Sequence, residues 1–307
     1  MNDSAATVLL AGCGDVGTAL GLRLAERGVR AVGVRRRADA LPEPLEPVSL
    51  DLTDPGEAVL PVADAVVVTL TADGRDATAY ERTYLGALRG LHLALPSDAA
   101  PRVVLVSSTG VLSGTDGEVV TEATPPDPQR ATAHVLLAAE ELAADLFPDL
   151  VIVRPAGIYG PGRTSLIERV RTATPVTHRR VTNRIHRDDL VTVLSTVLDA
   201  PEPPRLLHAV DHDAAQLGDV VTHLDTQPRE RGRSARSSTG RSCTPWFLDP
   251  GGATPPSGRG TTRCWERRRR RSATPTPGEP PAMPPSVTPG PGRTRRRTPR
   301  PNREARE

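Results

Sequence analysis

The chain of 307 residues contains no lysine, so all 39 of its Lys and Arg positions are arginines. This absence excludes every catalytic mechanism that depends on a lysine ammonium group. Aromatic residues are also scarce, at 2% of the chain, whereas alanine, glycine and proline are abundant. Together these features suggest a GC-rich coding sequence.

Cysteine is nearly absent as well. Cys13, Cys243 and Cys264 are odd in number, widely spaced and in no metal-ligand pattern, which argues against a disulfide framework and a zinc site. His208 and His212 lie four residues apart, but no third ligand keeps the spacing. We therefore expect no metal site and a reducing, cytoplasmic location.

Long hydrophobic runs are missing too. No apolar run approaches the roughly 20 residues of a membrane span. Residues 1–6 lack the basic and apolar regions of a signal peptide. The sequence therefore predicts a soluble protein with no membrane partner.

The charge of the chain is divided between two unlike parts. Residues 1–226 carry 20 arginines and 31 acidic residues, a net charge of −11, together with apolar runs that can form buried strands. Residues 227–307 carry 19 arginines and 6 acidic residues, a net charge of +13, and almost no aliphatic side chains. Because such a segment cannot bury enough apolar surface to offset its ordering entropy, we expect a disordered Arg/Pro-rich tail.

Two further hypotheses concern this tail. Its arginines would release counterions from phosphates, as in a nucleic-acid-binding arm, but only Trp246, Phe247 and Trp265 are available for stacking. Alternatively, the tail is an out-of-frame translation, because shifted frames of GC-rich genes are dominated by Arg, Pro, Gly, Ala, Ser and Thr codons. We prefer the frameshift hypothesis and rank nucleic-acid binding last.

Strand-like and helix-like segments alternate along the first part. Unbroken apolar runs, which suit strands covered on both faces, occupy Ala6–Ala11, Val29–Val34, Ala65–Leu70, Val103–Ser107, Leu150–Val153 and Leu206–Val210. Helical spacing marks Asp15–Gly28, Asp76–Leu95 with Tyr80 and Tyr84 in the core, Thr132–Phe147, Asp189–Asp199 capped by Asp188, and Leu217–Leu224. This alternation predicts an α/β fold of the Rossmann type, a doubly wound parallel sheet with helices on both faces.

A glycine motif lies between the first predicted strand and helix. Gly12-Cys13-Gly14-Asp15-Val16-Gly17 matches G-x-G-x-x-G at the start of a βαβ unit. The first glycine makes a tight turn, the second lets a pyrophosphate approach, and the third lets the helix pack on the strand. We therefore predict a dinucleotide-binding loop in which Gly12, Gly14, Asp15, Val16 and Gly17 contact the cofactor.

The end of the second predicted strand indicates which dinucleotide binds. NAD-selective domains place an acidic residue there to accept hydrogen bonds from the ribose, but this chain has Arg35, Arg36 and Arg37. A guanidinium matches a 2′-phosphate and offers no acceptor to a hydroxyl. NADP is therefore favoured, through Arg35 and Arg36, while NAD and a merely solvated basic turn stay open.

Several further motifs lie between Thr7 and Leu224. They are Asp51-Leu52, the VSSTGV segment at 106–111, the RPAGIYGPGR segment at 154–163, and the IHRDDL segment at 185–190. With the glycine motif, they resemble the extended short-chain dehydrogenase/reductase superfamily, the NAD-dependent epimerase/dehydratase-like group, and especially its atypical members. The resemblance implies an NAD(P)-binding Rossmann domain over residues 1–160 and a partial substrate lobe with closing elements over residues 161–226.

The resemblance also assigns site residues. It implies that Asp51 and Leu52 line the adenine, and that Leu70 and Thr71 pass the ribose and pyrophosphate. Ser107 and Pro155 complete the cofactor site, and Ser108 takes the place of the catalytic serine. On the substrate side it places Arg163 and Arg184, for which surface ion pairs with nearby acids are an equal alternative.

The resemblance fails at the general acid/base of the superfamily, a tyrosine followed one turn later by a lysine. These positions fall on Thr132 and Leu136. His134, or a water held by Thr132 and Ser108, could replace the acid, although His134 is expected to be an ordinary helix-surface residue. We expect an NAD(P)-binding oxidoreductase- or epimerase-like protein that acts on a small or nucleotide-sugar-like substrate, or else a non-catalytic dinucleotide-binding or sensing module.

The resemblance bears on the C-terminal side as well. Related proteins continue after the helix at 217–224 with an ordered segment that helps to close the substrate site, and here the Arg/Pro-rich tail follows instead. We therefore expect an incomplete substrate lobe. By analogy with the family, the helices predicted to begin at Asp76 and Thr132 could form a homodimer interface, and the oligomeric state stays open.

Overall fold

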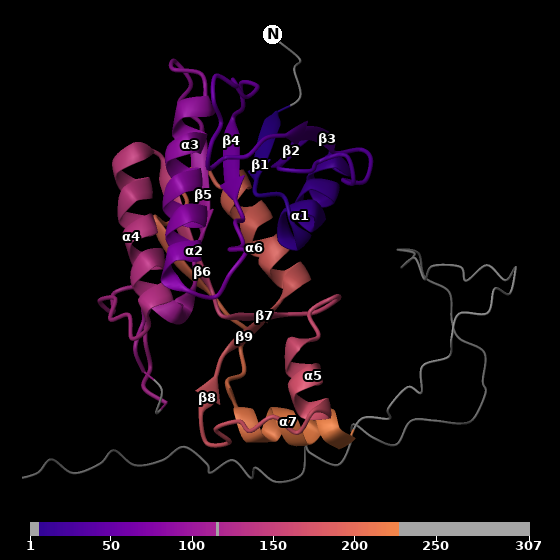
Figure 1. Ribbon diagram of the computed structural model, residues 1–307, viewed down its shortest axis with the longest axis vertical. Helices are drawn as coiled ribbons and strands as arrows, with labels where there is room; N and C mark the ends of the chain where they lie inside the picture. Colours follow the sequence, from indigo (N-terminus) through magenta and orange to yellow (C-terminus); the bar gives the residue numbers. More distant parts are fainter. Residues whose placement is uncertain (1–5, 115–116, 227–307) are drawn as a thin grey trace, which may run out of the picture. The chain divides into compact units, whose positions relative to one another are not determined.

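The computed structural model describes residues 6–114 and 117–226. Within them, seven strands form one sheet in the order β10-β6-β5-β4-β1-β2-β3 (Figure 1). Every neighbouring pair is parallel. The strands are β1 Thr7–Ala11, β2 Arg30–Arg35, β3 Glu46–Ser49, β4 Ala65–Val68, β5 Arg102–Val106, β6 Leu150–Pro155 and β10 Leu206–Ala209. The predicted Rossmann-type parallel sheet is confirmed.

Helices cover both faces of this sheet (Figure 1). On one face, α1 (Asp15–Ala25) and α6 (Arg187–Asp199) bury Leu20 and Leu194 with the inward side chains of the strands. On the other face, α3 (Ala87–Ala94) and α4 (Ala131–Leu146) bury Leu88 and Ala139 in a second core. Because both faces of the inner strands are covered, β1, β4 and β5 carry unbroken apolar runs, as the sequence indicated, whereas the edge strand β3 is largely exposed.

The helix expected over Asp76–Leu95 is interrupted. It consists of α2 (Ala77–Tyr80), a π-helical turn η1 (Glu81–Gly86) and α3. Tyr80 and Tyr84 stack at a ring-centre distance of 5.4 Å across the junction. Tyr84 packs against the core, and its hydroxyl donates a hydrogen bond to the carbonyl oxygen of Leu70 at 3.2 Å. Tyr84 is thus held beside the end of β4. Its burial there raises the pKa of the Tyr84 hydroxyl to about 12.

The expected cap of α6 is wrong. The helix begins at Arg187, and its N-cap is His186, whose Nδ1 accepts a hydrogen bond from the Asp188 backbone N–H at 3.3 Å. The Asp188 carboxylate instead pairs with Arg187 at 2.8 Å. An imidazole nitrogen therefore supplies the acceptor that the sequence pattern assigned to an aspartate.

Smaller elements follow β6. Strand β7 (Gly157–Tyr159) pairs in parallel with β9 (Arg184–His186), and β8 (Val181–Thr182) pairs antiparallel with β11 (Ala215–Gln216). Helix α7 (Leu217–Thr226) contacts β11, and helix α5 (Ser165–Arg171) packs against α7 (Figure 1). Residues 161–226, predicted as a partial substrate lobe with closing elements, contain α5, β8, β9, β11 and α7. They also contain β10, which belongs to the seven-stranded sheet, and α6, which packs on it.

The predicted Arg/Pro-rich tail, with its disorder, frameshift and nucleic-acid hypotheses, lies outside the described residues. No helix in the described ranges is both long and apolar enough to cross a membrane.

Candidate functional site

The glycine loop follows β1 at the centre of the sheet. Gly12 has a φ of +72°, and a side chain there would press on Leu70. A Cβ at Gly17 would lie 2.9 Å from the Thr69 hydroxyl, so this glycine lets α1 approach β4 closely. Around Gly14, only the Gly12 carbonyl oxygen would lie near an added Cβ, at 3.7 Å. The second glycine therefore faces open space, as the motif requires for a pyrophosphate.

The start of α1 adds an anion-binding feature to this loop. Gly14 is its N-cap, and no side chain caps the helix. The N–H groups of the first turn and the helix dipole therefore favour a negative group at this position. The loop also lies where the strand order of the sheet reverses. From β1 the chain runs outward through β2 and β3 on one side, and it then continues through β4, β5 and β6 on the other side. Doubly wound folds bind their ligands at such a switch point.

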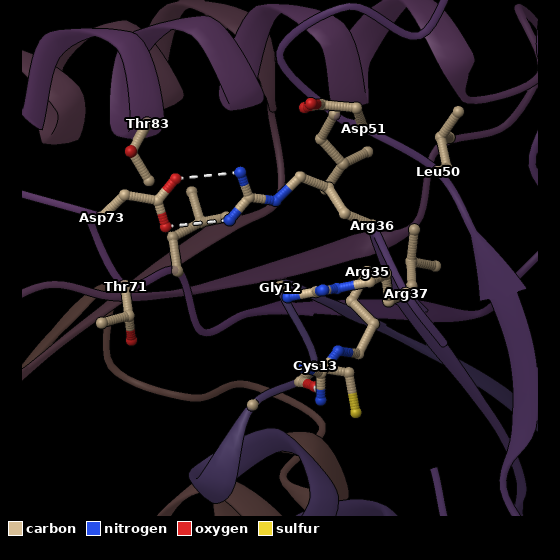
Figure 2. Close-up of a pocket in the computed structure, with 14 residues that line it drawn as sticks. Gly12, Cys13, Arg35, Arg36, Arg37, Leu50, Asp51, Thr71, Asp73 and Thr83 are labelled. Atoms are coloured by element: carbon tan, nitrogen blue, oxygen red, sulfur yellow. Dashed lines mark hydrogen bonds and ion pairs between the residues drawn. The ribbon is translucent and has the colours of Figure 1, made fainter. Parts of the chain in front are cut away.

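A pocket opens between the glycine loop and the ends of β2, β3 and β4 (Figure 2). The predicted cofactor residues that line it are Gly12, Gly14, Arg35, Arg36, Asp51, Leu52, Leu70 and Thr71. Residues that the sequence reasoning did not assign also line it: Cys13, Val34, Arg37, Leu50, Asp73 and Thr83. The segments at the ends of four different strands, β1, β2, β3 and β4, therefore converge on one cavity.

The arginines of the pocket have different partners. Arg36 forms a bidentate ion pair with Asp73, with nitrogen–oxygen distances of 2.9 and 2.8 Å (Figure 2). Arg35 reaches across the loop and donates a hydrogen bond to the Cys13 carbonyl oxygen at 3.3 Å. Asp73 lies in the loop between β4 and α2, where no motif marked it in the sequence.

The predicted adenine-side carboxylate is held in place by its neighbours. Asp51 accepts hydrogen bonds from the Thr53 hydroxyl and backbone N–H at 2.7 and 2.9 Å. These hydrogen bonds, with a smaller contribution from Arg36, lower the pKa of Asp51. Its carboxylate is therefore ionised at neutral pH.

Asp15 and Arg163, predicted for cofactor and substrate, contact each other. One Asp15 oxygen accepts from Arg163 Nε at 3.0 Å, and the other accepts from Arg187 Nη1 at 3.0 Å. This cluster joins the start of α1 to the loop before α5 and to α6. Arg163 therefore forms an ion pair with a nearby acid, the alternative that the sequence analysis left open for it.

The second predicted substrate arginine, Arg184, lies on β9. Its Nη1 donates a hydrogen bond to the Thr182 hydroxyl at 2.8 Å, and burial lowers the pKa of the guanidinium. On the same small sheet, Tyr159 packs edge-to-face on His186 at 5.2 Å.

A buried ion pair joins Arg154, near the end of β6, to Glu140 of α4. Arg154 donates to both oxygens of Glu140, at 3.0 and 2.6 Å, and each side chain is 4% exposed. Ser107 donates its hydroxyl hydrogen to the same carboxylate. The hydroxyl predicted to contact the cofactor is therefore engaged by Glu140, a residue that the sequence reasoning did not assign.

The predicted catalytic positions lie near this end of the sheet. Ser108 caps a short turn and accepts the Gly110 N–H at 3.0 Å, which leaves its own hydroxyl hydrogen available. Thr132 is half-buried at the start of α4, whereas Leu136, one turn later, is buried in the core. His134 is exposed, as expected of a helix-surface residue. No described side chain here reproduces a tyrosine and lysine pair. Pro155 follows Arg154 at the end of β6.

Comparison with known proteins identifies the family. A family model described as NAD(P)H-binding matches residues 12–201. The chain belongs to this NAD(P)H-binding family. The match runs from the glycine loop to just beyond α6, and the comparison with curated proteins found no match.

Solved structures share the fold of this NAD(P)H-binding protein. A Methylobacillus flagellatus protein assigned as an NAD-dependent epimerase/dehydratase is 29% identical, with a TM-score of 0.61, over 77% of this chain and 86% of its own. MoeE5, solved with UDP-glucuronic acid and NAD, is 24% identical, with a TM-score of 0.58 and coverages of 72% and 81%. UDP-glucuronic acid 4-epimerase from Bacillus cereus, solved with NAD, is 17% identical, with a TM-score of 0.59 and coverages of 71% and 83%. The predicted resemblance to the epimerase/dehydratase-like group is confirmed.

Proposed function

We propose that this protein binds NADP(H) in the pocket beside the glycine loop. The supporting observation is that the three consecutive arginines Arg35–Arg37 line the same pocket as Gly12 and Gly14. The glycine loop and the uncapped start of α1 suit a pyrophosphate. Guanidinium groups at the end of β2 suit the 2′-phosphate of NADP(H).

The acidic residues of the pocket support the same preference. An NAD-selective site needs a carboxylate that is free to accept hydrogen bonds from the ribose hydroxyls. Asp51 already accepts two hydrogen bonds from Thr53, and Asp73 is paired with Arg36. Neither carboxylate lies at the end of β2, where that acceptor would belong.

For the reaction, we propose reduction or oxidation of a small or nucleotide-sugar-like compound at a carbonyl or hydroxyl group. Bound NADP(H) would supply or accept the hydride. The Ser108 hydroxyl hydrogen, which no described acceptor engages, would polarise the substrate oxygen. Because Thr132 and Leu136 fall at the tyrosine and lysine positions, solvent water would donate the proton in reduction and accept it in oxidation, which favours slow turnover.

A second candidate is a dinucleotide-binding module without catalysis. The observation that favours it is the burial of Leu136 in the core at the position of the family's lysine. Retained NADPH binding with no consumption across a panel of carbonyl compounds would support this candidate. Turnover that Ser108→Ala abolishes, while binding persists, would support the enzyme.

A titration of the full chain tests the proposed cofactor. We expect NADPH to bind at least tenfold more tightly than NADH, because the phosphate gains charge-assisted hydrogen bonds. The double variant Arg36→Gln/Arg37→Gln should bring the two affinities within threefold. Arg89→Gln, on the exposed side of α3, removes the same kind of charge outside the pocket and should change neither. Equal affinities in the wild type would contradict the NADP preference, and no binding of either dinucleotide would contradict the function.

A further inference from the structure

The Arg36–Asp73 ion pair crosses the proposed nucleotide pocket. Arg36 follows β2 and Asp73 follows β4, and the two side chains meet between the glycine loop and Asp51 (Figure 2). Both terminal nitrogens of Arg36 are engaged, one by each oxygen of the carboxylate. This planar, bidentate arrangement is the one with which a guanidinium also binds a phosphate.

The charges around the pair hold both partners ionised. The ion pair with Arg36, with a smaller contribution from Arg82, lowers the pKa of Asp73. The ion pair with Asp73 raises the pKa of the Arg36 guanidinium, and a second carboxylate, Asp51, adds a smaller contribution. Arg36 therefore lies between two anions, and only Asp73 bonds to it directly among the described residues.

We propose that Asp73 is a specificity-determining residue that competes with the 2′-phosphate of NADP(H) for Arg36. This inference rests on the proposed binding of NADP(H). In the free protein, the Asp73 carboxylate takes the positions on Arg36 that the phosphate oxygens would occupy. A 2′-phosphate displaces it and leaves Asp73 facing Arg82, whereas NADH offers no anion that could do so.

The exposure of the pair sets the size of the effect. The side chains of Arg36 and Asp73 are 60% and 48% exposed. An ion pair this exposed is weak and solvent-screened, so a doubly charged phosphate can replace it. Loss of the competing carboxylate should therefore strengthen NADPH binding by about two- to fivefold, the range that corresponds to an exposed ion pair.

The test compares NADPH and NADH affinities of the full chain and its Asp73→Asn variant. Asp73→Asn keeps the shape of the side chain but removes its charge, and should strengthen NADPH binding two- to fivefold with NADH unchanged. Glu81→Gln removes one exposed negative charge from η1, two residues before the pocket-lining Thr83, and should leave both affinities unchanged. In the Arg36→Gln background, Asp73→Asn should have no effect on either dinucleotide.

Three outcomes would overturn the inference. Unchanged NADPH affinity in Asp73→Asn would show that the carboxylate does not compete. Weaker binding of both dinucleotides would show that the ion pair instead covers the bound adenine as a strap. Equal strengthening by Glu81→Gln would show only a general charge effect. If neither dinucleotide binds the wild-type chain, the proposed function itself fails. Failure of the Asp73 role alone would leave NADPH binding to the wild type intact, so the wild-type titration distinguishes the two failures.

Discussion

At the residue scale, the three glycines of the loop have separable physical roles. Gly12 is required by its positive φ, and Gly17 by the closeness of α1 to Thr69. Gly14 has neither constraint, since an added Cβ would meet only one backbone oxygen at an ordinary distance. The loop is open for a ligand at Gly14, so a substitution there should weaken cofactor binding with little effect on the free energy of unfolding.

We therefore expect Gly14→Ala to lower the free energy of unfolding by about 1 kcal/mol or less, the usual cost of alanine at an N-cap. The methyl group would project into the proposed path of the pyrophosphate, so NADPH affinity should fall at least tenfold. Urea unfolding and a fluorescence titration measure the two effects. NADPH affinity within twofold of the wild type would place the pyrophosphate elsewhere.

At the element scale, α3 supports the pocket through a close contact with the loop after β3. A Cβ on Gly90 would overlap the Leu52 carbonyl oxygen, and Leu52 lines the pocket. One turn earlier, a Cβ on Gly86 would make only ordinary contacts with Thr53, from 3.6 Å. The two glycines form a matched pair on adjoining helical segments that differ in the space around them.

Alanine substitutions at these glycines should have opposite effects. Alanine is favoured over glycine inside a helix by about 1 kcal/mol, so Gly86→Ala should raise the free energy of unfolding by up to that amount. In Gly90→Ala, overpacking against Leu52 should outweigh this gain and lower the free energy of unfolding by about 1–3 kcal/mol. Urea unfolding of both variants provides the measurement. A stabilised Gly90→Ala variant would show that the loop after β3 moves freely.

At the scale of the whole molecule, the parallel sheet and the glycine loop could be predicted because they depend on local patterns. Apolar runs, helical spacing and the G-x-G-x-x-G motif each lie within a few residues. The Arg36–Asp73 and Asp15–Arg163 pairs join residues 37 and 148 positions apart, and depend on tertiary structure. The His186 cap is a local contact, two residues from its donor, but the sequence reasoning missed it because an aspartate is the more usual capping residue.

Acid stability is also a property of the whole fold, because His208 lies on an edge strand packed against the buried Glu140–Arg154 pair. Among the described residues, nothing pairs with its Nε2, which is buried. Burial lowers the pKa of His208 below its ordinary 6.5, and Arg154 adds to this shift although two glutamates oppose it. The unfolded chain therefore binds a proton more readily than the folded one below about pH 6.5.

Stability from this histidine should be present above pH 6.5 and lost as the pH falls below that value. We expect the wild type to lose more free energy of unfolding between pH 7.5 and pH 5.5 than His208→Gln does. His134→Gln, at an exposed histidine on α4, should keep the wild-type pH dependence. Urea unfolding at the two pH values compares them, and identical pH dependence in all three proteins would contradict the assignment to His208.

The central claim is that the pocket beside the glycine loop recognises the 2′-phosphate of NADP(H). Its most direct test is a calorimetric titration of the full chain with adenosine 2′,5′-bisphosphate and with 5′-AMP. These fragments carry only the groups that the described pocket would hold, so the result does not depend on the nicotinamide or on turnover. We predict that the bisphosphate binds at least tenfold more tightly. Equal affinity for the two fragments would contradict the account.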